Sequence, residues 1–232
     1  MNGRRRLLIA AGLAAAGLAG CANPARIPPP AAAPLPPSVR IGDRWRYAKI
    51  NLYNGETLAK QEMRVTALEP LLRIEVTDGN GAGLPPETYV RAWDVVQENV
   101  WEQIQVFGTP CPLLPRRLEP GSVEDWRGIY QVPGDSWRYT SSVRIEAHDW
   151  ERVEAPAGVF DALRVSRRIA FVHQDFRRVG CQRLETLWYA PQVNRWVRRE
   201  VDGSCVVPGR PPMRVREDRV AWVLLEHLPA SR

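Results

Sequence analysis

The sequence predicts an all-β antiparallel domain, either a sandwich or a half-open barrel, and three observations support that prediction. Apolar and polar residues alternate with a period of two in many short segments, as in residues 72–77. The dipeptides Asn54-Gly55, Asp78-Gly79 and Asp202-Gly203 separate such segments and are typical of hairpin turns. A six-residue motif also recurs. These features predict hairpins joined into two repeated meanders.

The internal repeat defines the two meanders. Gly42-Asp43-Arg44-Trp45-Arg46-Tyr47 returns as Gly134-Asp135-Ser136-Trp137-Arg138-Tyr139, ninety-two residues later. An apolar segment follows each copy, and then come Glu87-Thr88-Tyr89 in the first and Glu185-Thr186-Leu187 in the second. The units are predicted at about residues 42–107 and 134–205, with a Pro- and Gly-rich connector over 108–134. Each unit alone would expose its apolar face, so both are expected in one domain.

The N-terminal twenty residues have the order of an export signal. Three arginines at positions 4–6 precede fourteen residues without a charged or polar side chain, fewer than the ~20 that a membrane-spanning helix needs. The run ends at Leu18-Ala19-Gly20-Cys21. This motif resembles the lipobox of bacterial lipoprotein precursors, which implies cleavage before Cys21 and lipidation of its thiol. Ala22, where Asp would imply retention in the inner membrane, implies the periplasmic side of the outer membrane.

The segment after the lipobox is predicted as a spacer. Residues 21–38 contain the lipidated Cys21 and seven prolines among alanines, a composition typical of a semi-stiff extended tether. The folded domain is expected over residues 39–232. Within it, residues 92–107 fit both helical and strand periodicity. No second long apolar run follows, so membrane contact is expected through the lipid anchor.

Charge gives little support for a nucleic-acid partner. Removing residues 1–20 lowers the net charge from +6 to +3, because three arginines and no acid lie there. The arginines of the domain alternate with acids, as in Arg73/Glu75, Arg199/Glu200 and Arg216/Glu217. This pattern favours solvated strand faces over a basic stripe. No nucleic-acid binding is therefore predicted.

Three cysteines remain once Cys21 is lipidated. If a hairpin is centred on Val193, Cys181 lies opposite Cys205, and the register predicts a cross-strand disulfide. Its loop of about 25 residues would stabilise the fold by roughly 3 kcal/mol. Cys111 would then be free or intermolecular. The two other pairings stay open at this point.

One motif suggests a hydrolase. Gly134-Asp135-Ser136-Trp137 resembles the nucleophile block of GDS-type esterases, which implies a late His with an Asp three residues before it. His227 has Leu224 at that position, and the repeat replaces Ser136 with Arg44. The chain is therefore predicted to be no enzyme, and a GDS-type hydrolase is the second alternative.

The histidines, at positions 148, 173 and 227, lack the spacing of metal ligands, and no phosphate-binding or dinucleotide motif is present, so no metal or cofactor is predicted. The nine tryptophans favour an aromatic core over an aromatic ligand cleft. Five of them are retained as possible ligand-lining residues. These are Trp45, Trp137, Trp188, Trp196 and Trp222.

Two C-terminal segments carry a second resemblance. Ala155-Pro156-Ala157-Gly158-Val159-Phe160-Asp161-Ala162 and Glu185-Thr186-Leu187-Trp188-Tyr189-Ala190-Pro191 resemble uncharacterised proteobacterial envelope proteins with an all-β domain. The favoured function is a non-enzymatic binding or assembly module of the cell envelope. The first alternative is a carrier or chaperone that encloses a lipid or lipoprotein acyl chain in an apolar β cavity. The expected partners are the membrane and either a lipid or an envelope protein.

Overall fold

The computed structural model describes residues 24–32, 34–101 and 103–230, so the lipobox and Cys21 lie outside the described residues. Fourteen strands and one short 3₁₀ turn at Pro191–Val193 are present there. The strands are β1 (Ala25–Ile27), β2 (Arg44–Asn51), β3 (Thr57–Ala67), β4 (Leu72–Asp78), β5 (Gly83–Tyr89), β6 (Asp94–Glu98), β7 (Gln105–Pro112), β8 (Val123–Gln131), β9 (Tyr139–Ala155), β10 (Gly158–Phe171), β11 (Val179–Ala190), β12 (Arg195–Val207), β13 (Met213–Arg216) and β14 (Val220–Leu228).

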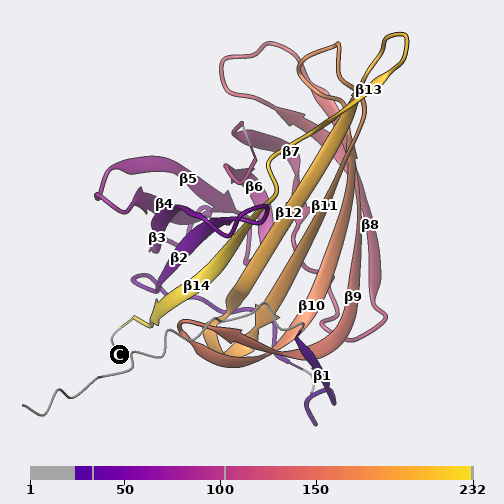
Figure 1. Cartoon of the computed structure of the whole chain (residues 1–232). Helices are drawn as coiled ribbons and strands as arrows, with labels where there is room; N and C mark the ends of the chain where they lie inside the picture. Colours follow the sequence, from indigo (N-terminus) through magenta and orange to yellow (C-terminus); the bar gives the residue numbers. More distant parts are fainter. Residues whose placement is uncertain (1–23, 33, 102, 231–232) are drawn as a thin grey trace, which may run out of the picture.

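The strands form one closed barrel (Figure 1). From β2 to β12 each strand pairs antiparallel with the next, and β14 joins β12 back to β2, so twelve strands make the ring. β1 and β13 lie outside the ring, on β9 and β12. The all-β antiparallel prediction is confirmed, and closure removes the open edges that a half-open barrel would have. None of the described helical structure is long and apolar enough to span a bilayer.

Period-two alternation separates the inside of the barrel from the outside. In β4, Leu72, Ile74 and Val76 are buried while Arg73 and Glu75 are exposed. The same alternation runs through the long strands β9 to β12, so one face of each strand supplies the core. Apolar burial inside the ring therefore holds the strands together.

Two local predictions are corrected, and one open assignment is resolved. Asp202-Gly203 was expected to be a turn, but both residues lie inside β12. The connector over residues 108–134 contains the end of β7 and all of β8, which closes the ring against β9. Residues 92–107, which fitted both periodicities, contain β6 and the start of β7. By contrast, Asn54-Gly55 lies in the tight turn between β2 and β3.

The predicted spacer is not free of the barrel. Ala25 to Ile27 pair with Arg152 to Trp150 of β9, and the backbone N–H of Ser38 donates to Asn194 Oδ1 at 3.2 Å. Pro34, Pro36 and Pro37 line a cavity together with Trp93. The described part of the Pro-rich segment therefore packs on the domain.

The repeat motif begins with a similar glycine-aspartate turn in both copies. Gly42 and Gly134 have φ of +97° and +85°, the left-handed region that favours glycine. The aspartate that follows holds each turn: Asp43 Oδ2 accepts from the Arg40 N–H at 2.8 Å, and Asp135 Oδ1 accepts from the Trp137 N–H at 2.9 Å. The similarity ends there, because the first Glu-Thr landmark lies three strands after its motif and the second lies two strands after.

Candidate functional site

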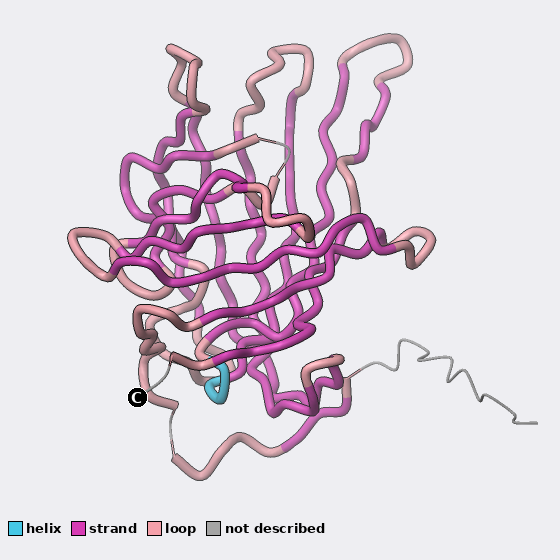
Figure 2. Tube along the Cα trace, turned by 90° about the vertical axis from the view of Figure 1, so that its left-hand side faces the viewer, coloured by secondary structure: helices cyan, strands magenta, loops and turns pink. Residues whose placement is uncertain are grey.

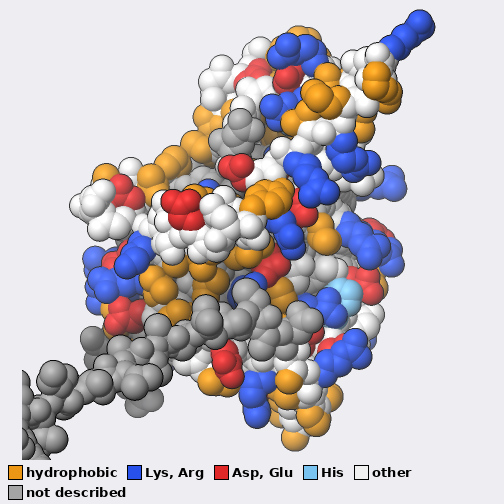
Figure 3. Space-filling view, in the orientation of Figure 1, with side chains coloured by type: hydrophobic (Ala, Val, Ile, Leu, Met, Phe, Trp, Pro, Cys, Tyr) orange, Lys and Arg blue, Asp and Glu red, His pale blue; other side chains and the backbone are white. Residues whose placement is uncertain are grey.

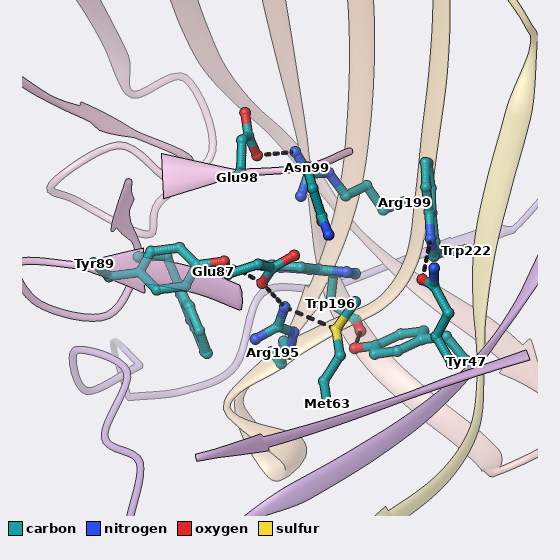
Figure 4. Close-up of polar contacts among 12 residues, drawn as sticks. Tyr47, Met63, Glu87, Tyr89, Glu98, Asn99, Arg195, Trp196, Arg199 and Trp222 are labelled. Carbon is teal, nitrogen blue, oxygen red and sulfur yellow. Dashed lines mark hydrogen bonds and ion pairs between the residues drawn. The ribbon is translucent and has the colours of Figure 1, made fainter. Parts of the chain in front are cut away.

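The first candidate region is the barrel interior at the end where β11 turns into β12. Arg195 is fully buried there, and its Nη2 donates to Glu87 Oε2 at 2.7 Å (Figure 4). Its guanidinium carbon lies 4.0 Å from the ring centre of Trp196 and 4.6 Å from that of Trp93. Cation–π contacts thus complement the single ion pair.

The buried indoles also fix the turn. Trp45 Nε1 donates to the Val193 carbonyl at 2.9 Å, and Trp93 Nε1 donates to the Asn194 carbonyl at 3.0 Å. Asn194 itself has φ of 53°, in the left-handed region. Two large rings therefore fill the space and satisfy the carbonyls of a turn that ends the hairpin.

A second set of buried charges lies further along the interior. Arg199 Nη2 donates to Glu98 Oε2 at 2.9 Å, and Arg199 Nε donates to Glu185. Arg167 Nη1 donates to the other oxygen of Glu185, and its Nη2 donates to the Cys111 sulfur at 3.2 Å. These side chains are essentially inaccessible to solvent. Positive and negative charges balance within the two sets.

Burial and neighbouring charges shift the pKa values of Glu185 and Cys111. Burial alone would raise the pKa of Glu185, but Arg199 and Arg167 outweigh it and lower that pKa. Burial raises the pKa of the Cys111 thiol to about 12 despite the nearby Arg167. Glu185 is therefore a carboxylate and Cys111 a neutral thiol at physiological pH. Their arrangement stabilises the fold and offers no activated nucleophile.

The interior leaves little free space. The cavity beside Cys111, between Glu98 and Arg167, has a volume of about 10 Å³. A cavity for a drug-sized ligand has ~300–1,000 Å³. The surrounding positions are filled by buried aromatic, aliphatic and charged side chains. An acyl chain does not fit beside Cys111 in this packing.

The five candidate ligand-lining tryptophans do not form one site. Trp45 and Trp196 are buried around Arg195, and Trp222 is buried near Lys49, 5.2 Å from its ammonium. Trp188 donates to Glu151 Oε2 at 2.7 Å in a separate cluster. Trp137 is 61% exposed, so it does not share an enclosed cleft with the four buried tryptophans. An exposed Trp137 also breaks its equivalence with the buried Trp45.

The predicted disulfide is confirmed. Cys181 and Cys205 are bonded, and the neighbouring pair Gln182 and Ser204 keeps the register expected from a hairpin centred on Val193. Cys111 is free and buried. This disulfide joins β11 and β12 at the ends that lie away from the turn at Val193.

No catalytic pair forms around Ser136. Ser136 is exposed in the loop between β8 and β9, where Asp135 is engaged with Trp137 and Tyr139. A serine–histidine contact does occur between Ser166 and His148, at 2.7 Å. Ser166 lies in mid-strand, however, where ladder pairing uses the backbone N–H groups that an oxyanion would need. In the described parts of the chain, no group of three or more His, Cys, Asp or Glu could hold a metal ion.

The second candidate region is on the outside. Two adjoining cavities of about 1000 and 530 Å³ lie on the outer face of β8–β13 and share Arg127, Ser142, Ala170 and Gln182. We call them together the outer groove. Lys and Arg side chains gather over the flank where Figure 1 places these strands (Figure 3).

Cross-strand registers arrange the outer groove into rows. The charged row runs across five strands as Asp125, Arg144, Arg168, Leu184 and Asp202. The polar row, two residues further along each strand, runs as Arg127, Ser142, Ala170, Gln182, Ser204 and Arg216. The apolar row comes next and contains Ile129, Thr140 and Val172. Successive rows are about 7 Å apart.

The charged row contains an unfavourable pair. Arg144 and Arg168 lie directly opposite each other on β9 and β10, and like charges in that position destabilise a sheet. Asp125 accepts from Arg144 at 3.4 Å. Arg168 and Arg127 have no ion-pair partner among the described residues. The groove thus keeps cationic side chains whose charge the fold does not neutralise.

Aromatic side chains continue the apolar row. The loops after β8 and β10 project from one end of the barrel (Figure 2). There Trp137 and Phe176 make an edge-to-face contact with ring centres 5.9 Å apart, and both are more than 60% exposed. The outer groove therefore changes from cationic to apolar toward this tip.

Comparison with known proteins identifies the fold. No protein-family model matches the chain, and no curated protein sequence matches it. Two solved structures share its architecture. One is a candidate lipoprotein from Parabacteroides distasonis, 16% identical with a TM-score of 0.50, covering 84% of this chain and 97% of that one. The other is a candidate exported protein with YmcC-like fold from Bacteroides fragilis, also 16% identical with a TM-score of 0.50, covering 85% and 100%. At this identity the likeness shows the fold alone.

Sequence reasoning missed both regions. Arg199/Glu200 was interpreted as a solvated face, but Arg199 is buried. The signal was present, because Val197 and Val201 share its side of the strand under a period of two. The outer groove gave no such signal, since its residues come from six strands whose registers only the fold supplies.

Proposed function

We propose that this chain is a lipoprotein anchored through Cys21 on the periplasmic side of the outer membrane, where its barrel acts as a non-enzymatic binding module. The lipobox sequence supports the anchor. The fold shared with a candidate lipoprotein and a candidate exported protein agrees with an envelope location.

The observation that carries the binding role is the contrast between a filled interior and an outer groove whose arginine-lined cavity has a volume of about 1000 Å³. A binding module needs accessible groups, and Arg127 and Arg168 are exposed. The filled interior argues against the alternative of an acyl-chain carrier with an apolar chamber. The exposed loop position of Ser136 argues against the hydrolase.

The strand pairing supports a particular orientation of the barrel relative to the proposed anchor. Cys21 precedes Ala25 by four residues, so the anchor is at most ~14 Å from β1. Ala25 pairs with Arg152 of β9, and Arg144 lies eight residues away on that strand, a rise of about 27 Å. The outer groove is thus set well apart from the anchored end and is open to ligands in the periplasm.

The test of the anchor is metabolic labelling of the full chain with alkyne-tagged palmitate in a Gram-negative host, followed by separation of the two membranes. We expect label on the wild type, none on Cys21→Ser, and the wild type in the outer-membrane fraction. A wild type without label, or one recovered as soluble periplasmic protein, would refute the anchor.

A further inference from the structure

We propose that the outer groove binds an amphiphilic anion: a phosphate monoester headgroup at the charged row, with an alkyl or acyl chain lying along the apolar row. This inference deepens the proposed function, because it names the ligand class of the binding module.

The headgroup assignment follows from the two opposed arginines. Arg144 and Arg168 face each other across β9 and β10, and Arg127 lies one row away. Guanidinium groups bind phosphate in a bidentate geometry, and a doubly charged phosphate monoester can bond two of them at once. Binding such a group would relieve the like-charge repulsion between Arg144 and Arg168.

The acids of the groove are consistent with that assignment. Asp125 is engaged with Arg144, and Asp202 lies 3.9 Å from Arg219, outside the groove. Neither reaches Arg168 within ion-pair distance. The two acids lie at the two ends of the charged row, so the centre of the row is cationic.

The chain assignment follows from the gradient along β9 and β10. Beyond the polar row lie Ile129, 39% exposed, and Val172, 47% exposed. The same direction leads to the exposed Trp137 and Phe176 at the tip. Exposed apolar groups that continue from a cationic pocket fit the tail of an amphiphile, whereas a free phosphate or a nucleotide would leave them uncovered.

The test uses isothermal titration of residues 22–232, which retain every described strand, exported to allow the disulfide to form. The probes are decyl phosphate below its micelle concentration, inorganic phosphate and the neutral decyl maltoside. We expect decyl phosphate to bind at least about ten-fold more tightly than either of the other two.

Two double variants distinguish the contribution of the headgroup site from that of the alkyl-chain site. Arg127→Gln with Arg168→Gln is expected to weaken decyl phosphate roughly ten- to hundred-fold, because charge-assisted bonds are lost. Ile129→Ser with Val172→Ser is expected to weaken decyl phosphate by about ten-fold or less while leaving inorganic phosphate unchanged. All four side chains are exposed, so each variant should retain the wild-type circular dichroism and a thermal midpoint no lower than that of the wild type.

The matched control is Arg64→Gln with Arg73→Gln, which removes two exposed arginines from the outer face of β3 and β4. It is expected to bind decyl phosphate like the wild type. Equal loss in the control, equal binding of decyl maltoside, or equal binding of inorganic phosphate would overturn the proposal. The palmitate experiment is independent of these outcomes, so failure here leaves the anchor to be judged by its own result.

Discussion

Replacing Glu185 with Gln removes one negative charge from the sealed interior while keeping the side-chain shape. Both oxygens of Glu185 accept bonds from guanidinium groups, those of Arg167 and Arg199, and none of the three side chains is accessible to solvent. The amide can satisfy only one of the two arginines and leaves the interior with an unpaired positive charge. Removing one partner from a buried ion pair typically destabilises a protein by ~3–5 kcal/mol.

The assay is urea unfolding followed by tryptophan fluorescence, with the disulfide intact. With a slope near 3 kcal/mol per molar urea, the expected loss lowers the midpoint by about 1–2 M. The control Glu62→Gln breaks the Arg46–Glu62 pair on the outer surface, where Arg46 is about half exposed, and is expected to leave the midpoint almost unchanged. A midpoint for Glu185→Gln no lower than that of the control would refute the interpretation of the interior charges.

The same variant makes a prediction about pH. The folded-state pKa of Glu185 is lower than its unfolded value, so its stabilisation is fully present above the unfolded pKa of ~4.3. It is lost as the pH falls through the folded pKa. The wild type should therefore lose stability more steeply than Glu185→Gln below about pH 4. Parallel acid-unfolding curves would show that Glu185 contributes no such dependence.

Three further predictions concern stability and thiol chemistry. Cys181→Ser with Cys205→Ser should lower the free energy of unfolding by roughly 3 kcal/mol in urea. An unchanged free energy of unfolding would mean that the disulfide does not stabilise the domain. Trp93→Ala should lower the free energy of unfolding by ~3–5 kcal/mol because it leaves a cavity at a buried site. Trp137→Ala should leave the thermal midpoint unchanged, because Trp137 is exposed. Equal effects of the two substitutions would contradict this difference in burial. The Cys111 thiol should resist a thiol-specific reagent at pH 8 in the native state and react after unfolding, as its burial and pKa of about 12 imply.

Short-range pattern predicted much of this fold. Alternation placed Leu72, Ile74 and Val76 on the buried face, and the hairpin centred on Val193 fixed the disulfide register. Both depend on neighbours a few residues apart or across one turn, where sequence carries the geometry directly. Local rules were therefore sufficient for these strand faces and one cross-link, but they placed a turn at Asp202-Gly203, inside β12.

Local rules could not predict that the barrel closes or that arginine–glutamate pairs are buried inside it. β8 lies in a Pro- and Gly-rich stretch, and its pairing with β9 completes the ring. Arg167 and Arg199 meet at Glu185 only because β10, β11 and β12 are neighbours, so an Arg/Glu pattern alone could not show that they are buried. The groove depends even more on tertiary structure, since it combines residues from six strands.

The most direct test of the central claim, a filled barrel that binds on its outer face, is photo-crosslinking with a decyl phosphate that carries a diazirine in its chain. Peptide mapping locates the label. Label on β8, β9 and β10 around Ile129, Thr140 and Val172 is the predicted result. Label on peptides that contain Trp45, Trp93 or Trp196 would place the ligand inside the barrel and contradict the account.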